Sequence, residues 1–219
     1  HVAMRGATID MKIGMAYHIM LSSVKLCYNK FNADHAVFCL EGRSWRKDFY
    51  EPYKKNRQVA RMAKSVREQE EDQIMFQSYD DMVTFLNDKT NVTMLRNPEA
   101  EADDMIALFI AAHPNDNHII VSSDSDYFQL ITDNVTMYDG VQNRIITKDG
   151  FFKDDKNMTP IKEKKTGEIK EKVDPEWALF EKCVRGDTSD NIFSAYPGCR
   201  KKGTRNKIGM QEAYADRDT

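Results

Sequence analysis

Along the first half of the chain, segments whose apolar residues have the spacing of a helix alternate with short apolar runs that are typical of strands. Apolar side chains between Ile13 and Phe31 recur at helical spacing behind Asp10, which predicts an amphipathic helix with Asp10 as its N-cap. The apolar run 35–40 has the length of a strand and ends at Glu41-Gly42, which predicts a buried strand. Residues 57–89 contain neither Gly nor Pro and mix charged with apolar side chains, so helices are expected there.

The second half continues this alternation. Short apolar runs predict strands at 92–95, 118–122, 135–138 and 144–147. Helices are expected over 98–112, with Pro98 at the first helical position, and over 125–131, 175–184 and 208–214. The lysine-rich stretch 153–172 is expected to be a solvated hairpin or loop. Strands that alternate with helices predict an α/β fold, with a mostly parallel sheet flanked by helices.

Composition narrows the class of protein. The chain has 219 residues, of which 41% are hydrophobic and 31% charged, as in a globular protein. It has no apolar run near the roughly 20 residues that span a bilayer and no signal-peptide pattern, so a cytoplasmic protein is predicted. The four cysteines lack CxxC spacing and suggest neither a zinc site nor a disulfide framework. Because His1 is not an initiator methionine, we expect the native protein to extend further.

Positive charge is concentrated in two stretches although the net charge is only −3. The first, 43–67, carries aromatic residues among its cations, and the second, 200–207, follows the last acidic cluster. Such mixtures suit a phosphate backbone, whereas the alternative for the first stretch is an ordinary solvated helix. The candidate nucleic-acid contacts are Arg43, Arg46, Lys47, Tyr53, Lys55, Arg61, Lys64, Arg67, Arg200, Lys201, Lys202 and Arg205.

Carboxylates gather where the predicted strands end. Glu41 ends one strand, Asp124 and Asp126 follow another, and Glu101 with Asp104 begins a helix after a third. Ligands in open α/β sheets bind outside the carboxyl ends of the strands, and clustered carboxylates favour a hard cation such as Mg²⁺. Two such ions about 3.5–4 Å apart can support in-line phosphodiester hydrolysis.

Taken singly, each of these acidic groups has a structural explanation. Acids in the first turn of a helix are favoured by its dipole, and Asp124 alone would be an N-cap. Asp187 and Asp190 alone could be turn formers. The order of the clusters, each behind a strand or helix, makes the metal hypothesis stronger than any single cluster does.

Three segments together resemble the 5′ nuclease superfamily of flap endonucleases and 5′→3′ exonucleases. They are Glu-Ala-Asp-Asp at 101–104, Ser-Ser-Asp-Ser-Asp-Tyr-Phe-Gln-Leu at 122–130 and Gly-Asp-Thr-Ser-Asp-Asn-Ile at 186–192. Trp-Arg-Lys-Asp-Phe at 45–49 and Tyr-Lys-Lys-Asn-Arg at 53–57 are closer still to the ribonucleases H of T-even-like bacteriophages within that superfamily. The resemblance extends over 15–216.

The resemblance implies a PIN-like nuclease core over 1–185, with a basic helical arch in 43–89 and a polar hairpin or loop in 151–173. The start of a C-terminal helical DNA-binding region would occupy 186–219. Lys54 and Arg57 match residues that reach the scissile phosphate. The metal ligands implied, with Glu41 added from its strand position, are Glu41, Glu101, Asp103, Asp104, Asp124, Asp126, Asp187 and Asp190.

The implied function is removal of RNA primers and 5′ flaps in phage DNA replication, with two Mg²⁺ ions, for which Mn²⁺ substitutes, and RNase H activity. The implied partners are DNA and RNA·DNA hybrids with 5′ ends, and a single-strand-binding protein or sliding clamp. No membrane partner is expected. The chain is expected to be a monomer in the host-cell cytoplasm.

Two departures from the family pattern leave alternatives open. No residue before Asp10 matches the Asp of the family's first strand, and Glu41 stands where the family usually has Asp. The segment 196–203 only loosely keeps the turn that grips duplex phosphates and K⁺, so a K⁺ site is left open. A non-catalytic nucleic-acid-binding relative and a PIN-type single-strand ribonuclease remain as the alternatives.

Overall fold

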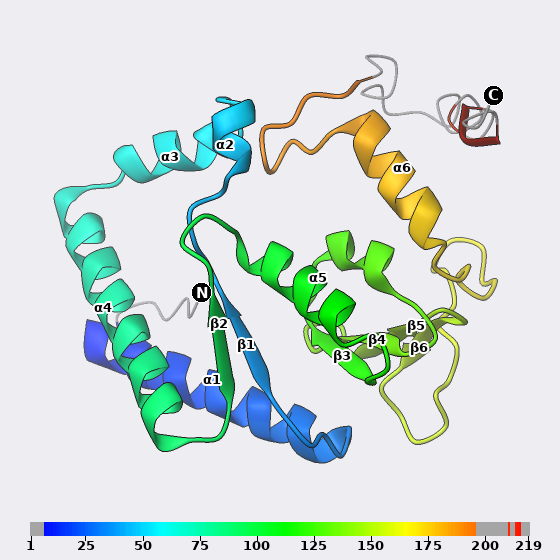
Figure 1. Ribbon diagram of the computed structural model, residues 1–219, viewed down its shortest axis with the longest axis horizontal. Helices are drawn as coiled ribbons and strands as arrows, with labels where there is room; N and C mark the ends of the chain where they lie inside the picture. Colours follow the sequence, from blue (N-terminus) through cyan, green and yellow to red (C-terminus); the bar gives the residue numbers. More distant parts are fainter. Residues whose placement is uncertain (1–6, 196–209, 211–212, 216–219) are drawn as a thin grey trace. The chain divides into compact units, whose positions relative to one another are not determined.

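A computed structural model gives the fold and describes residues 7–195, 210 and 213–215 (Figure 1). The chain divides into two compact units, His1–Leu108 and Phe109–Thr219, and each is described by itself. The division expected at residue 185 stays a prediction. None of the described helices is both long and apolar enough to cross a membrane.

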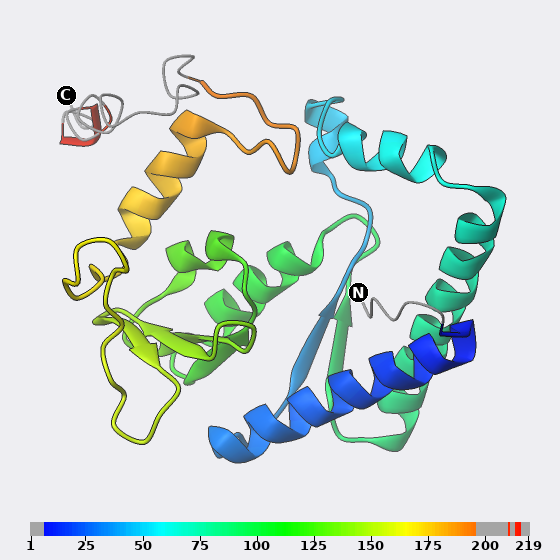
Figure 2. The ribbon, with the colours of Figure 1, turned by 180° about the vertical axis from the view of Figure 1, so that it is seen from behind.

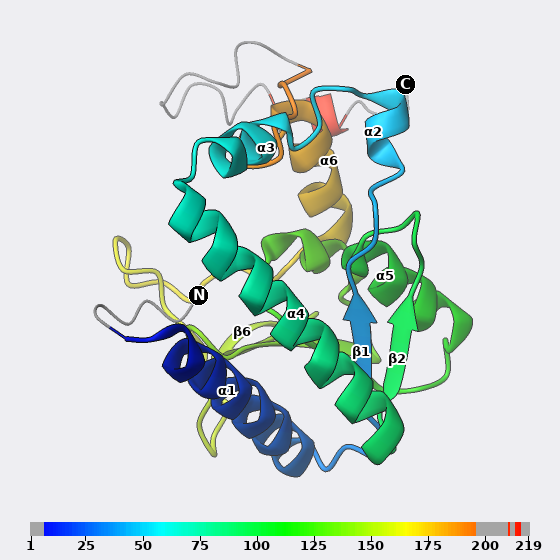
Figure 3. The same ribbon diagram turned by 90° about the vertical axis from the view of Figure 1, so that its left-hand side faces the viewer.

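Unit 1 is built on two short parallel strands and a set of helices. The strands β1 (Val37–Leu40) and β2 (Thr93–Arg96) pair along their whole length. The helix α4 contacts α1 and β2, and Figure 3 shows α1 and α4 lying side by side. The helices of this unit are α1 (Ile9–Lys30), α2 (Arg46–Phe49), α3 (Lys55–Met62), α4 (Val66–Lys89) and the greater part of α5 (Ala102–Ala112).

The helix ends of unit 1 follow from local capping. The first helix is confirmed, but Asp10 lies in its first turn, and the N-cap is Thr8, whose side chain accepts a hydrogen bond from the Met11 N–H. The helical expectation for 57–89 is confirmed as two helices, because Ser65 and Glu68 form a capping box that starts α4.

Unit 2 is a four-stranded sheet in the order β3-β4-β5-β6. Its first pair is parallel and the other two pairs are antiparallel. Met137, Ile146, Val135 and Ile131 are almost completely buried and form its core. The elements are β3 (His118–Val121), the 3₁₀ helix η1 (Ser125–Leu130), β4 (Val135–Asp139), β5 (Arg144–Thr147), β6 (Gly150–Lys153) and α6 (Pro175–Arg185).

Three expectations about secondary structure need correction. The helix α5 begins at Ala102 rather than at Pro98, because the Asn97 side chain accepts from the Glu99 N–H and holds 97–101 in a turn. Within 125–131, residues Ser125–Leu130 form a 3₁₀ helix. The strand β6 was not predicted, although its Phe151 is buried.

A close approach of two backbones at Gly42 connects the fold to the acidic cluster. Beyond β1 and β2 the chains continue side by side, with Gly42 N–H donating to Ala100 O at 2.9 Å and Trp45 N–H to Glu99 O at 3.1 Å. A Cβ atom at Gly42 would lie 2.0 Å from Asn97 O. Only glycine therefore fits at this position.

Gly42→Ala is expected to lower the free energy of unfolding by about 2–3 kcal/mol, because the backbones must separate to admit the methyl group. The matched control is Gly14→Ala inside α1, where an added Cβ meets no atom within 4 Å. That change should instead raise stability by about 0.5–1 kcal/mol. Urea unfolding followed by circular dichroism measures both, and equal effects of the two variants would contradict the packing described.

Candidate functional site

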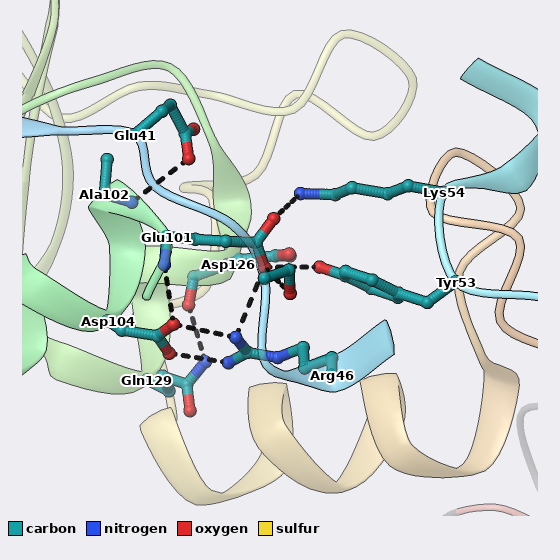
Figure 4. Close-up of polar contacts among 10 residues, drawn as sticks. Glu41, Arg46, Tyr53, Lys54, Glu101, Ala102, Asp104, Asp126 and Gln129 are labelled. Carbon is teal, nitrogen blue, oxygen red and sulfur yellow. Dashed lines mark hydrogen bonds and ion pairs between the residues drawn. The ribbon is translucent and has the colours of Figure 1, made fainter. Parts of the chain in front are cut away.

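Glu101 is the centre of an acidic cluster in unit 1 (Figure 4). It lies just before α5 and is only 5% exposed. Its Oε2 atom accepts hydrogen bonds from Ser44 Oγ at 2.9 Å and Tyr53 OH at 2.8 Å, and its Oε1 atom forms an ion pair with Lys54. Burial by itself raises the pKa of Glu101, but the hydrogen bonds from Lys54, Tyr53 and Ser44 outweigh it, and the net pKa is lowered. Glu101 is therefore ionised at neutral pH.

Asp104 shares a guanidinium group with Glu101. Arg46 binds Asp104 through both terminal nitrogens, Nη2 to Oδ1 at 2.8 Å and Nη1 to Oδ2 at 2.9 Å. The same Nη1 atom lies 3.2 Å from Glu101 Oε2, so one cationic nitrogen serves two carboxylates. The hydrogen bond from Arg46 lowers the pKa of Asp104 despite its partial burial.

The helix α5 positions the remaining acids of unit 1. Glu41 Oε2 accepts from the Ala102 N–H at 3.2 Å, so this carboxylate caps the first residue of α5 (Figure 4). Asp103 is exposed on the first turn of the same helix. The structure thus gives Glu41 a helix-capping contact, while its role as a metal ligand stays a prediction.

Lys182 joins two carboxylates in unit 2. It lies in the last turn of α6, which packs on η1. Its Nζ atom is 2.6 Å from Asp126 Oδ1, which is buried, and 3.0 Å from Asp187 Oδ2. Burial lowers the pKa of Lys182, but the two carboxylates outweigh it and raise that pKa to about 12. Lys182 is a firmly charged cation between two acids.

A tight turn after α6 holds Asp187 in place. The Asp187 Oδ1 atom accepts from the Ser189 N–H at 2.7 Å and from Ser189 Oγ at 2.6 Å. These bonds lower the pKa of Asp187, with Lys182 adding to the shift against partial burial. Gly186 begins the turn at φ +69°, and a Cβ there would lie 2.6 Å from Ile192 O. Asp187 is thus a turn former as well as a partner of Lys182.

The other two predicted ligands of unit 2 lie nearby in sequence. Asp124 is the N-cap of η1, and its side chain accepts from the Asp126 N–H at 3.0 Å, which orders the loop that carries Asp126. Asp190 is half-buried within the turn.

The basic stretch 43–67 is largely engaged in local ion pairs. Arg43 pairs with Asp48 and Glu99, Lys55 with Glu51, Lys64 with Asp72, and Arg67 with Glu71. Lys47, Arg57 and Arg61 are exposed. Tyr53 is buried beside Glu101, and its hydroxyl donates a hydrogen bond to that carboxylate, while the prediction that it contacts nucleic acid stays a prediction. Arg200, Lys201, Lys202 and Arg205 lie outside the described residues.

Two residues of the clusters were missed in the sequence. Ser44 and Lys182 both bind predicted metal ligands, yet a serine beside a basic stretch and a lysine within a helix give no signal of their own. Lys54 is placed at the N-cap of α3 in the left-handed region, with φ +53°, from which its side chain reaches Glu101. The sequence predicts that all the carboxylates converge on one site. Because these residues belong to both units, this convergence stays a prediction.

The carboxylate oxygens in both clusters are ligands that suit a hard divalent cation. Within the described part of the chain, however, no group of three or more His, Cys, Asp or Glu side chains could by itself hold a metal ion. In each unit two carboxylates share one cationic nitrogen, Arg46 Nη1 for Glu101 and Asp104, and Lys182 Nζ for Asp126 and Asp187. The positively charged nitrogen lies between the two carboxylates, where a metal ion would also be attracted. Carboxylate oxygens are ligands that suit Mg²⁺ or Mn²⁺.

Comparison with known sequences finds one family over most of the chain. Residues 6–158 match the family described as 5′-3′ exonuclease, N-terminal resolvase-like domain. DNA polymerase I of Rhizobium leguminosarum is 28% identical over 185 residues, which cover 84% of this chain and 15% of that protein. Flap endonuclease Xni of Pseudoalteromonas translucida (strain TAC 125) is 26% identical over 209 residues, covering 93% of this chain and 65% of that one. The chain spans less than two thirds of either relative.

Solved structures share the fold. The 5′-exonuclease of bacteriophage T5 with bound zinc ions matches with a TM-score of 0.64 and 19% identity, over 89% of this chain and 65% of that one. The bacteriophage T5 flap endonuclease, in a pseudo-enzyme-product complex with DNA and metal ions, matches with a TM-score of 0.65 and 18% identity, over 97% of this chain and 69% of that one. The α/β fold expected from the sequence is therefore confirmed.

Proposed function

Since the chain belongs to the family of 5′-3′ exonuclease N-terminal, resolvase-like domains, we propose that it hydrolyses phosphodiester bonds near the 5′ ends of nucleic acids. The activity would be that of a 5′→3′ exonuclease and flap endonuclease dependent on divalent metal ions. RNase H activity and removal of RNA primers in phage DNA replication belong to the same proposal, as do a cytoplasmic location and partners such as a single-strand-binding protein or a sliding clamp. These finer points rest on the sequence resemblance.

The observation that carries this proposal is the repeated arrangement of two carboxylates around one cationic nitrogen. It occurs in unit 1 at Arg46 and in unit 2 at Lys182. An acid that only caps a helix does not need a cation shared with a second acid. Carboxylates that lie close enough to bind one metal ion repel one another unless a cation lies between them. The sequence places both clusters in the acidic motifs of the superfamily.

Mg²⁺, or Mn²⁺ in its place, would be held by Glu101, Asp103, Asp104, Asp124, Asp126, Asp187 and Asp190, and when bound it supplies an activated water and neutralises charge on the phosphate. The capping contact of Glu41 makes it a candidate for orienting α5 as well as for metal binding. The segment 196–203, for which a K⁺ site was left open, lies outside the described residues, and no K⁺ site is proposed.

Lys54 and Arg57 would bind the scissile phosphate. Lys54 is only 16% exposed and forms an ion pair with Glu101, so it must exchange that partner to reach a phosphate. Glu101 would keep the hydrogen bonds from Ser44 and Tyr53, and Arg46 would stay beside it. Because these contacts remain, the exchange does not leave a bare buried carboxylate, and Lys54 can move with little loss of stability.

A cleavage assay on the full chain tests the function. The substrates are a DNA duplex with a labelled 5′ flap, an RNA·DNA hybrid and a single-stranded RNA, each incubated with Mg²⁺ or with EDTA. We expect short products from the flap and the hybrid with Mg²⁺ and none with EDTA. Saturable binding without product at every Mg²⁺ concentration would establish the non-catalytic alternative, and cleavage of the single-stranded RNA alone would establish the PIN-type ribonuclease.

A further inference from the structure

A basic hollow of about 690 Å³ opens on unit 2 beside the long loop after β6, which is drawn in yellow in Figure 2. None of the proposed metal ligands lines it. Its acidic lining residues are Asp154, Asp155 and Glu163. Its cationic lining residues, which define the basic hollow, are Arg144, Lys153, Lys162, Lys164, Lys165 and Lys170.

The acids in the lining only partly neutralise these cations, because they are fewer. Asp154 accepts a hydrogen bond from Tyr138 OH at 3.1 Å, and Asp155 Oδ1 accepts from the Asn157 and Thr159 N–H groups at 3.1 and 3.0 Å. Both carboxylates are thus oriented by neighbouring groups of the chain. Arg144 is balanced by Asp139, which is fully buried 3.0 Å away, but the five lysines face only three acids. The hollow therefore keeps a positive potential.

The Lys170 ammonium lies against an aromatic ring and near a second cation. Its Nζ atom lies 3.8 Å from the centre of the Phe151 ring, and Arg144 lies 5.4 Å from the centre of the same ring. Among the described residues no acceptor forms a hydrogen bond with this ammonium. Burial and then the charge of Arg144 lower the pKa of Lys170. A half-buried ammonium beside a second cation is stabilised when an anion binds.

Strand register places the hollow on the edge of the sheet that also carries the loop with Asp124 and Asp126, which follows β3. Val121 at the end of β3 pairs with Tyr138, and Asp139 at the end of β4 pairs with Arg144, which in turn pairs with Lys153. Arg144 and Lys153 are therefore two and three strands from the end of β3, about 10–14 Å away. Measured along the axis of B-form DNA, that distance corresponds to about three to four phosphates of one strand.

We propose that the basic hollow binds phosphate groups of a phosphate ester, and that on nucleic acid it holds the backbone a few nucleotides from the bond that is cleaved. The second clause rests on the proposed function, whereas the first does not. Phe151 lies beneath the cations with 4% exposure, so it offers no exposed ring for a base to stack on. Recognition is therefore of phosphate rather than of base sequence.

The test compares two triple variants of the full chain with the same change in charge. The hollow variant is Lys162→Gln, Lys165→Gln and Lys170→Gln. The control variant, Lys148→Gln, Lys156→Gln and Lys172→Gln, alters lysines of unit 2 that do not line the hollow. Binding to a blunt DNA duplex of about 20 base pairs is measured over a range of salt in EDTA, which excludes cleavage. Thermal stabilisation by inorganic pyrophosphate is measured in parallel.

The expected result is that the slope of log affinity against log salt falls by up to about 2.7 in the hollow variant, since each of the three lost phosphate contacts removes about 0.9, and is unchanged in the control. If the slope is unchanged but stabilisation by pyrophosphate is lost only in the hollow variant, the site binds the phosphate groups of a small molecule rather than those of DNA. Equal changes in both triple variants, or no change in either, would overturn the proposal. The binding assay contains no divalent metal, so it does not depend on cleavage. If the unaltered chain fails to cleave but the hollow variant has a reduced slope, the proposed function is refuted and phosphate binding by the hollow still stands.

Discussion

Glu101→Gln is expected to lower the free energy of unfolding by about 3–5 kcal/mol, the largest effect on stability that we predict. The carboxylate is buried and compensates two cations, Arg46 and Lys54, besides accepting from Ser44 and Tyr53. The amide that replaces it has the same shape but no charge, so both cations lose the group that balances them. Urea unfolding of the full chain, with circular dichroism as the readout, measures the change.

Glu99→Gln is the matched control two residues earlier. Glu99 pairs with Arg43, but its side chain is 63% exposed and Arg43 is 53% exposed. An exposed pair of this kind contributes little to stability, so Glu99→Gln should leave the free energy of unfolding nearly unchanged. A loss for Glu101→Gln no greater than that for Glu99→Gln would show that the buried network does not hold unit 1 together.

Asp126→Asn is expected to reduce cleavage of a 5′ flap at least about a hundredfold in Mg²⁺, which is the largest effect on activity that we predict. Losing a group that merely supports a metal ligand already costs about 10- to 100-fold, and Asp126 is placed here as a ligand itself. The substitution removes a charge from the Asp126–Asp187 pair around Lys182. Single-turnover rates compared with the unaltered chain measure the loss.

Asp133→Asn serves as the control for Asp126→Asn. Asp133 is exposed and forms an ion pair with Lys148, so its removal also deletes one carboxylate beside one lysine in unit 2. Cleavage by Asp133→Asn should stay near the unaltered rate. Binding of flap DNA in EDTA should be kept by both variants, because no metal ion takes part. Loss of DNA binding together with cleavage in Asp126→Asn would assign Asp126 a structural role.

The parts of the fold with strong periodicity could be predicted from the sequence. The strands β1 to β5 and the helices α1, α4 and α6 lie where apolar spacing placed them, because a regular spacing of apolar residues marks each of them in the sequence. The strand β6 was missed because the lysines that follow Phe152 hide a two-residue apolar pair, and because its pairing with β5 is a tertiary contact. The start of α5 was misplaced because the Asn97 side chain competes with the helix for backbone N–H groups.

The acidic motifs could be found from the sequence, but their partners could not. Glu101, Asp126 and Asp187 stand at recognisable positions after strands or a helix. Lys182 becomes their neighbour only when α6 packs on η1, and Ser44 only when the chain after β1 runs beside the chain after β2. Tyr53 was named as a candidate nucleic-acid contact because it lies among cations, and its hydrogen bond to a buried carboxylate could not be predicted from the sequence.

The most direct test of the central claim, that the carboxylate clusters bind the divalent ions used in cleavage, is a titration of the full chain with Mn²⁺ in which free Mn²⁺ is followed by electron paramagnetic resonance. We predict saturable binding to the unaltered chain and to Asp133→Asn, with binding weakened at least about tenfold in Asp126→Asn. Identical binding curves for Asp126→Asn and Asp133→Asn would contradict the account.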